Sequence, residues 1–217
     1  MIKMKIKAII FDLDGVLLFT DEYHYLAWKK IADGIGVYFD RKINNRLRGV
    51  SREESLEIIL ENDANRFDSY EKKAFLNEKN EYYKKLLQNM TPDDVEPLVR
   101  ETLSKIKQMG YKIAIGSSSK NTKFILERVD MLNVFDAISD GTNITNSKPD
   151  PEVFVKAAQM LDVPAEQCCV IEDAAVGIQA AKEAGMVAIG IGDARNYPEC
   201  DYKIDSLAEL IDIITNY

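Results

Sequence analysis

The chain has 217 residues, of which 46% are hydrophobic and 29% are charged, so it can build one α/β domain with room for an insert. Its net charge is −8 and no basic stripe stands out, which argues against nucleic acid as a partner. No apolar run approaches the roughly 20 residues that cross a bilayer. Acidic residues also interrupt the N-terminal apolar run. We therefore expect neither a membrane partner nor a signal peptide.

The three cysteines point to a reducing compartment. Cys168 and Cys169 are adjacent, Cys200 stands apart, and no C-x-x-C pair is present. Neighbouring cysteines bridge poorly, so disulfides are not expected. We expect a cytoplasmic monomer in which Cys168 and Cys169 fill core space and have no redox role.

The first predicted element is a strand over residues 6–10, which runs into Phe11-Asp12-Leu13-Asp14-Gly15. Residues two apart in an extended segment point the same way, so the carboxylates of Asp12 and Asp14 share one side. Such close like charges repel, and a cation relieves the repulsion. The pair therefore predicts a divalent-metal site with carboxylate chemistry, with a solvated Asp-rich turn as the alternative.

A helical insert is predicted after this strand. Helices are expected around residues 27–32, 56–60 and 70–88, where apolar residues recur at helical spacing. Thr91-Pro92 marks the return connection. We therefore expect a helical cap domain over residues 18–91, inserted into an α/β core domain built from residues 1–17 and 92–217.

Strands and helices alternate in the second half of the chain. Strands are predicted over residues 111–115, 168–171 and 187–191. One intervening helix ends at Gly110, and the next begins at Asp150-Pro151, with the aspartate as N-cap and the proline in the first turn. The alternation indicates an α/β fold with a Rossmann-like parallel sheet core and right-handed crossovers. Ligands of such sheets bind beyond the carboxyl ends of the strands.

Three further polar motifs follow the predicted core strands. The run from Gly116 to Asn121 offers hydroxyls and backbone N–H groups that can cradle a phosphate, with a plain loop as the alternative. Lys148 carries a compact charge suited to a phosphoryl oxygen, although a single such lysine is commonly a surface residue. Glu172 and Asp173 can complete a magnesium site with the first acid pair.

Taken together, the acid pair, the serine loop, the lysine and the second acid pair resemble the motifs of the haloacid dehalogenase (HAD) superfamily of phosphoryl-transfer enzymes. The resemblance covers the whole chain, including a helical cap after the first motif. It implies the HAD fold and a covalent mechanism. Asp12 would be the nucleophile that forms an aspartyl-phosphate, and Asp14 would be the general acid and base.

The same resemblance implies a cofactor and its ligands. Mg²⁺ would be held by Asp12, the main-chain carbonyl of Asp14 and Asp173, with Glu172 nearby. The groups that would neutralise the transferring phosphoryl oxygens are Ser117, Ser118 and Lys148.

Cap segments of this chain are similar to those of sugar-phosphate mutases within the superfamily. By that resemblance Arg52 would grip the phosphate that is not reacting, because a guanidinium fork suits a phosphate dianion. His24 would sense a sugar hydroxyl and help place Asp14, although a single histidine is more often a packing or surface residue. The other substrate-binding residues implied are Trp28, Gly49, Val50, Ser51 and Lys79 in the cap, and Ser119, Lys120 and Asn121 in the core.

These observations favour a mutase that moves a phosphoryl group on a sugar phosphate by way of a bisphosphate. The first alternative is a phosphatase of the same fold acting on a sugar phosphate or phosphoglycolate, and the second is a non-catalytic binding module. His24, Arg52 and Lys79-Asn80 favour the mutase, because a hydrolase needs no second phosphate grip in the cap. The family pattern commonly has an aspartate where this chain has Phe19, in the connection that a closing cap must bend.

Overall fold

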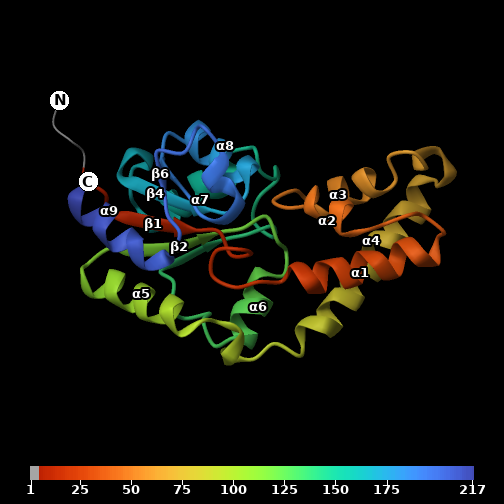
Figure 1. Cartoon of the computed structure of the whole chain (residues 1–217), viewed down its shortest axis with the longest axis horizontal. Helices are drawn as coiled ribbons and strands as arrows, with labels where there is room; N and C mark the ends of the chain where they lie inside the picture. The colour runs from red at the N-terminus through yellow and green to blue at the C-terminus, as the bar shows by residue number, and fades with distance from the viewer. Residues whose placement is uncertain (1–4) are drawn as a thin grey trace.

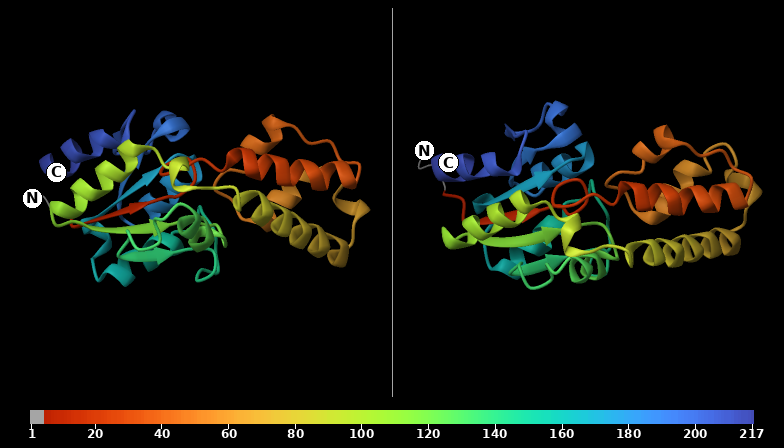
Figure 2. Two further views of the ribbon diagram at one scale, coloured as in Figure 1. Left: turned by 90° about the horizontal axis from the view of Figure 1, so that it is seen from below. Right: turned by 60° about the horizontal axis from the view of Figure 1, so that its bottom comes forward.

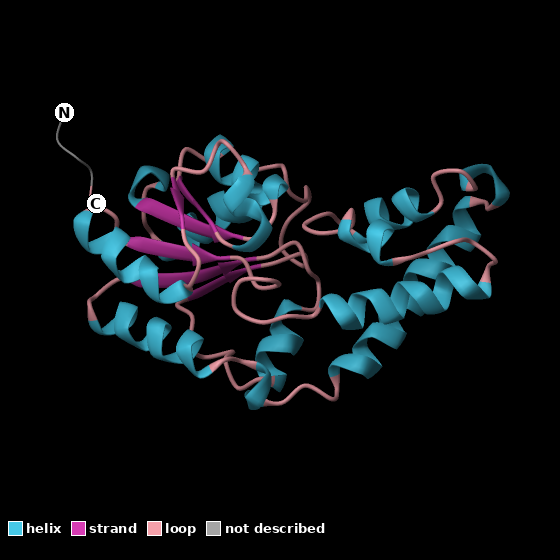
Figure 3. Ribbon diagram, in the orientation of Figure 1, coloured by secondary structure: helices cyan, strands magenta, loops and turns pink. Residues whose placement is uncertain are grey.

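A sheet-based part and a helical part lie end to end in the fold (Figures 1 and 3). The computed structural model describes residues 5–217. Residues 1–4, which open the expected core segment 1–17, lie outside the described residues. Within the described part of the chain no helix is long and apolar enough to cross a bilayer.

Six strands of the described chain form one sheet. They are β1 Ala8–Phe11, β2 Lys112–Gly116, β3 Ala137–Ser139, β4 Cys168–Glu172, β5 Val187–Gly190 and β6 Tyr202–Lys203. Their order in space is β3-β2-β1-β4-β5-β6, and every neighbouring pair is parallel. The predicted parallel sheet is therefore confirmed. Sequence patterning missed β3 and β6, which are too short to show a clear apolar run.

Helices cover both faces of the sheet (Figure 1). They are α5 Pro97–Gln108, α6 Thr122–Arg128, α7 Glu152–Leu161, α8 Ala175–Glu183 and α9 Leu210–Asn216. Successive strand residues point to opposite faces, so Ile9 and Phe11 pack in one apolar cluster with α5 and α9. Ala8 and Ile10 pack in another cluster with α7 and α8. The core thus consists of two apolar layers around a buried sheet.

The start of α7 differs from the sequence prediction by one residue. The helix begins at Glu152, and Pro151 rather than Asp150 occupies the N-cap position. The Asp150 carboxylate still accepts a hydrogen bond from the Glu152 N–H at 2.9 Å. Asp150 therefore caps α7 from the position before the N-cap, and not from the N-cap itself as predicted.

Four helices make the second part of the fold. They are α1 Asp21–Gly34, α2 Arg41–Asn45, α3 Arg52–Ile59 and α4 Ser69–Leu87. α1 and α4 lie side by side in both views of Figure 2 and pack on each other. Trp28, Ile31 and Leu56 belong to an apolar cluster that is separate from the two clusters on the sheet. This part has its own core, which fits an inserted unit; the boundaries at residues 18 and 91 stay a prediction.

Short 3₁₀ turns complete the described structure. They are η1 Ala64–Arg66, η2 Pro92–Asp94, η3 Ala165–Gln167, η4 Gly192–Asn196 and η5 Leu207–Glu209. η2 lies where the chain returns from the cap helices, and η4 follows β5 at the carboxyl edge of the sheet.

Candidate active site

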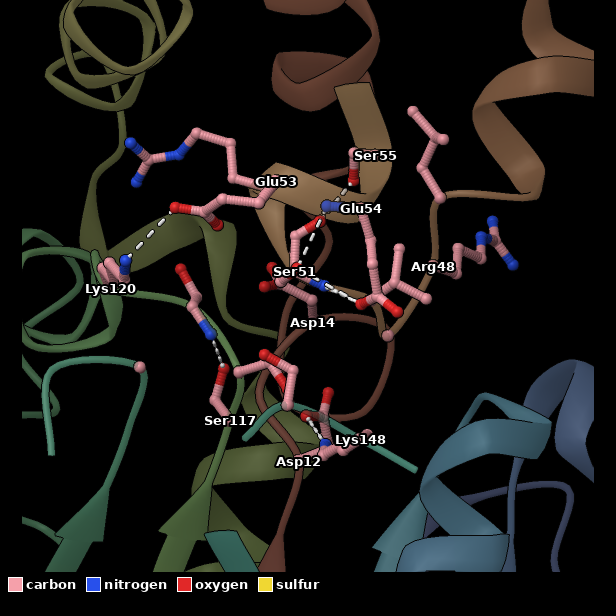
Figure 4. A pocket seen from close by; sticks show the side chains of 18 of the residues that line it. Asp12, Asp14, Arg48, Ser51, Glu53, Glu54, Ser55, Ser117, Lys120 and Lys148 are labelled. Carbon is pink, nitrogen blue, oxygen red and sulfur yellow. Dashed lines mark hydrogen bonds and ion pairs between the residues drawn. The ribbon is translucent and has the colours of Figure 1, made fainter. Parts of the chain in front are cut away.

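A cavity of about 820 Å³ lies where the carboxyl edge of the sheet meets the cap helices. Every residue that the sequence singled out as a site residue lines it. Figure 4 shows Asp12, Ser117 and Lys148 on the sheet side, and Ser51 and the start of α3 on the cap side. The fold therefore brings together motifs that lie up to about 160 positions apart in the chain.

Asp12 directly follows β1, and its N–H donates to the carbonyl of Ile171 on β4 at 3.0 Å. This bond fixes the residue at the floor of the cavity, where only 7% of it is exposed. The ammonium of Lys148 donates to the Asp12 carboxylate at 2.5 Å and also to the carboxylate of Glu172. Burial by itself would lower the pKa of Lys148, but the two acids together raise that pKa above its ordinary value. Lys148 is therefore a fixed positive charge beside Asp12.

Three carboxylates gather here, and Lys148 pairs with two of them, Asp12 and Glu172. Oxygen atoms of Asp12, Glu172 and Asp173 lie within 4.8 Å of one another. Burial, partly offset by Lys148, raises the pKa of Glu172 to about 7. Burial and the neighbouring acids raise the pKa of Asp173 to about 8. Such a set of hard oxygen donors with excess negative charge fits a divalent cation such as Mg²⁺.

Gly15 leaves room for this acid cluster. Its φ is +84°, and a Cβ atom there would lie 2.2 Å from a carboxylate oxygen of Asp173. Any larger residue would push the Asp173 carboxylate away and would strain the backbone as well. The glycine of the first motif is thus required by the position of the acid in the last.

Asp14 lies two residues after Asp12 in the same segment. The hydroxyl of Thr20 donates to its carboxylate. Burial and the nearby charge of Asp12 raise the pKa of Asp14 to about 7. A carboxyl group that titrates near neutrality can both accept and return a proton, which is the property that a general acid and base needs.

The serine loop connects β2 to α6. Ser117 is buried, and its N–H donates to the carbonyl of Ser139 at 3.1 Å. The hydroxyls of Ser117 and Ser119 accept from the N–H groups of Ser119 and Asn121, each at 3.2 Å. The Ser118 hydroxyl, by contrast, is buried with no partner in the described chain. The loop is thus tied to β3 and to itself, and one hydroxyl stays available.

The cap side of the cavity holds a buried lysine. Lys79 is 2% exposed, and its Nζ lies 3.0 Å from Nδ1 of His24. The same Nζ lies 5.1 Å from the ring centre of Trp28 and 4.3 Å from that of Tyr83. Burial lowers the pKa of Lys79 well below its ordinary value and likewise lowers the pKa of His24. Within residues 5–217 no carboxylate forms an ion pair with Lys79.

The loop before α3 supplies the remaining cap residues. Ser51 caps α3: its hydroxyl accepts from the Glu54 N–H at 3.1 Å, and the Glu54 side chain accepts from the Ser51 N–H. Arg52, the first residue of α3, is half-buried and makes no ion pair with any described residue. Lys120 from the core pairs with Glu53 of the cap at 3.4 Å. Arg52 is therefore a positive group still open to a ligand.

Comparison with known proteins agrees with this geometry. A model of the haloacid dehalogenase-like hydrolases matches residues 6–185. The chain belongs to the haloacid dehalogenase-like hydrolase family. Beta-phosphoglucomutase of Bacillus subtilis is 44% identical over 206 residues, which cover 94% of this chain and 91% of that protein.

Two further relatives are a mutase and a phosphatase. A crystal structure of β-phosphoglucomutase from Clostridium difficile has a TM-score of 0.91 and 39% identity, with 97% of each chain covered. The phosphorylated carbohydrates phosphatase of Thermotoga maritima is 33% identical over 184 residues, which cover 83% of this chain and 82% of that protein. The haloacid dehalogenase-like family thus includes both mutases and phosphatases among relatives of this chain.

The positions of Lys148 and Phe19 were not fixed by the sequence pattern. Lys148 does not follow a strand directly, because it lies in the long loop between β3 and α7. Phe19, which stands where the family commonly has an acid, is 67% exposed and does not line the cavity. The missing acid therefore leaves the cavity wall intact, and Thr20 next to it still reaches Asp14.

The sequence assigned no role to two residues that matter here, Thr20 and Tyr83, and it singled out a third, Asn80, only together with Lys79. Thr20 holds Asp14, Tyr83 packs on His24 with ring centres 4.2 Å apart, and Asn80 accepts from the Asn121 side chain at 3.0 Å across the two parts. The start of α1 carried a signal for Thr20, since a threonine before two acids is an ordinary helix start. Tyr83 carried none, because only packing brings it to the cavity. The contact of Asn80 with Asn121 likewise depends on packing.

Proposed function

We propose that this member of the haloacid dehalogenase-like family is a β-phosphoglucomutase, which interconverts β-D-glucose 1-phosphate and glucose 6-phosphate. The observation that carries the proposal is the presence of positive groups at both ends of one cavity. Lys148 lies beside Asp12 on the sheet side, and Lys79 and Arg52 stand on the cap side without acid partners in residues 5–217. The 44% identity to the Bacillus subtilis enzyme supports the same substrate class.

In the first half of the reaction, the enzyme carries a phosphoryl group on Asp12. Asp14 takes the proton of the sugar C6 hydroxyl, and the C6 oxygen attacks phosphorus. The bond between phosphorus and the Asp12 oxygen breaks, which yields glucose 1,6-bisphosphate and a free Asp12 carboxylate. The raised pKa of Asp14, about 7, suits both its deprotonated and its protonated role.

In the second half the bisphosphate has turned round in the cavity. Asp12 attacks the phosphorus at C1, and the bond from that phosphorus to the C1 oxygen breaks. Asp14 returns its proton to the C1 oxygen, so that glucose 6-phosphate leaves and phospho-Asp12 is restored. The ammonium of Lys148, 2.5 Å from the Asp12 carboxylate, offsets the charge on the transferring oxygens in both halves.

We propose Mg²⁺ as the cofactor of this chemistry. Its ligands would be Asp12, Glu172, Asp173 and the main-chain carbonyl of Asp14. When bound, Mg²⁺ supplies positive charge to the phosphoryl oxygens. Ser117 and Ser118 would add hydroxyl donors from the protein, and the free hydroxyl of Ser118 supports this role.

The non-reacting end of the substrate would be held mainly by the cap. Arg52 would grip the distal phosphate, with Ser119, Lys120 and Asn121 approaching from the core side. The Lys79–His24 pair would bind the sugar hydroxyls next to Asp14. The cavity wall over the sugar would consist of Trp28, Gly49, Val50 and Ser51. The half-buried, unpaired guanidinium of Arg52 supports the first of these roles.

The arrangement of the chain fits this cycle. We propose a core domain of residues 1–17 and 92–217 and a cap domain of residues 18–91, whose closure excludes water from phospho-Asp12. We propose a monomer as the working unit, with the cavity lined from both the core and the cap of one chain. The three cysteines form no disulfide, which fits the cytoplasm.

One assay tests the proposal directly. The protein is given Mg²⁺, β-glucose 1-phosphate and a trace of glucose 1,6-bisphosphate, and glucose 6-phosphate and free phosphate are measured separately. We expect glucose 6-phosphate in proportion to substrate consumed, with little free phosphate. Asp12→Asn should lose both products, and the α anomer should give no glucose 6-phosphate.

The second candidate is a phosphatase acting on sugar phosphates. The 33% identity to the Thermotoga maritima phosphatase is the observation that supports this alternative. Free phosphate in proportion to substrate, without glucose 6-phosphate, would establish the phosphatase and reject the mutase. Loss of Arg52 separates the two as well: Arg52→Ala should reduce mutase turnover far more than single phosphoryl transfer to Asp12.

A further inference from the structure

Arg48 joins two acids that come from the two parts of the fold. Its Nη2 donates to the carboxylate of Asp21, the first residue of α1 in the cap. Its Nη1 lies 3.0 Å from the carboxylate of Asp193, in η4 of the core. The chain positions of Arg48 and Asp193 differ by 145 residues. In Figure 4 the Arg48 side chain extends away from Asp12 and Lys148, so it does not point at the reacting centre.

The core end of this bridge is hydrogen-bonded to the backbone of the acid cluster. The N–H of Ala194, next to Asp193, donates to the main-chain carbonyl of Asp173 at 2.9 Å. The N–H of Ile191 donates to the carbonyl of Glu172, also at 2.9 Å. The segment that carries Asp193 therefore holds the backbone of both acids that follow β4.

The cap end leads to Asp14. Asp21 directly follows Thr20, whose hydroxyl donates to the Asp14 carboxylate and which is almost fully buried. The charge of Asp21 lies close enough to raise the pKa of Asp14. By pairing with Asp21, Arg48 both anchors the start of α1 and balances a negative charge beside Asp14.

The neighbour of Arg48 touches the core as well. Gly49 has a φ of +76°, and a Cβ atom there would lie 2.5 Å from the side chain of Val176 on α8. The cap loop thus rests directly on the start of the helix that follows Asp173. Nε of Arg48 is buried without a partner in the described chain, so only its two terminal nitrogens bind acids.

We propose that Arg48 is a positioning residue that couples closure of the cap to the placement of Asp14 and Asp173. This inference rests on the proposed mutase function. With the bridge formed, the cap stays seated, and phospho-Asp12 meets the sugar hydroxyl in preference to water. With the bridge broken, water enters: its oxygen attacks phosphorus, the bond to the Asp12 oxygen breaks, Asp14 takes the proton, and inorganic phosphate leaves.

The activity test compares Arg48→Met with a matched control. In Arg48→Met we expect free phosphate per glucose 6-phosphate to rise about fivefold, the effect of losing the exposed ion pair that joins cap and core at Asp193. KM should rise as well, because the cap is then held less firmly against the core. Arg48→Lys should recover part of the wild-type product ratio. The control is Arg46→Met, because Arg46 lies in the same loop and pairs with Glu61 inside the cap.

A second measurement does not depend on the activity. Hydrogen–deuterium exchange in the substrate-free protein is followed in residues 190–197 for Arg48→Met and in residues 46–52 for Asp193→Ala. Each variant is thus examined in the segment of its partner, whose sequence is unchanged. We expect faster exchange in both, and no further change in the double variant beyond the larger single effect.

The outcomes separate the two claims. Unchanged exchange in both partner segments, or an equal rise in phosphate release in Arg46→Met, would overturn the coupling. Wild-type protein that releases phosphate and never forms glucose 6-phosphate would overturn the mutase function, while the exchange data would still decide whether the bridge links cap and core.

Discussion

At the scale of single residues, Lys79 is the side chain whose environment calls most for a functional explanation. It is 2% exposed, packs on two aromatic rings, and has a histidine as its nearest polar partner. A buried ammonium without a carboxylate is unfavourable for folding. Such a group persists where a ligand needs it, which supports the proposed contact of Lys79 with the sugar phosphate.

Lys79→Met should therefore stabilise the protein while it reduces activity. We expect the free energy of unfolding to rise by about 1–3 kcal/mol, because a buried amine without a carboxylate partner leaves the interior. Mutase kcat/KM should fall about 100-fold, as for other preorganised donors. Urea unfolding and steady-state kinetics measure the two effects. Lys73→Met, an exposed position on the same helix, should change neither.

His24 makes the stability depend on pH. Its pKa is lowered well below the ordinary 6.5 by burial, by Lys79 on α4 and by Arg52 on α3. The folded protein keeps the imidazole neutral, whereas the unfolded chain takes up a proton below pH 6.5. The unfolded state thus binds more protons, and the free energy of unfolding falls as the pH drops below 6.5.

This dependence should disappear in His24→Asn. For wild type we expect a loss approaching about 1.4 kcal/mol per pH unit below pH 6.5 from this residue. Urea unfolding at pH 7.5 and 5.5 in both proteins measures the difference. Equal losses in the two proteins would show that His24 takes up its proton without opening the fold.

At the scale of elements, two capping boxes fix where two of the cap helices begin. Ser51 and Glu54 form one at the start of α3, and Asp68 and Glu71 form the other at the start of α4. In each box a side chain and a backbone N–H are satisfied reciprocally. The box of α3 has a second consequence, because the next residue is Arg52, which faces the cavity.

Comparison of Ser51→Ala with Asp68→Ala separates these effects. Each should lower the free energy of unfolding by about 1 kcal/mol through loss of a cap. Ser51→Ala should also raise KM, because the start of α3 then holds Arg52 less firmly. Asp68 lies away from the cavity, so its variant should keep the wild-type KM. A normal KM in both variants would mean that the cap box does not position Arg52.

At the scale of the whole molecule, the parallel sheet creates the acid cluster. β1 and β4 are neighbours, and Phe11 pairs with Ile171, so the acids after each strand meet at one edge. Asp12 and Asp173 are thereby brought into one group from distant parts of the sequence. A cation at that group would bind the folded chain and not the unfolded one.

Mg²⁺ should therefore raise the melting temperature. At a concentration 100 times its dissociation constant, the gain in unfolding free energy would be about 2.7 kcal/mol. Asp173→Asn should lose most of the Mg²⁺-dependent shift, and EDTA should remove it from wild type. Asp212→Asn, at an exposed position on α9, serves as the control and should keep the full shift.

Much of the fold could be read from local patterns. The strands over β1, β2, β4 and β5 show as short apolar runs because both faces of the sheet are buried. β3 and β6 have three and two residues, too few for a period to appear. The roles of Thr20 and Tyr83 could not be predicted from the sequence, because a residue's distance from the cavity depends on how helices pack.

The sequence by itself determined which acids, lysine and hydroxyls exist, and that the acids and the serine loop follow strand ends. These features depend on residue type and short-range order, which the chain carries locally. The tertiary structure decided which groups are paired and which remain open. Lys148 is held by two acids while Lys79 has none, and Arg48 spans the cap and the core. Burial and long-range contact set those differences, because they arise only when distant segments pack together.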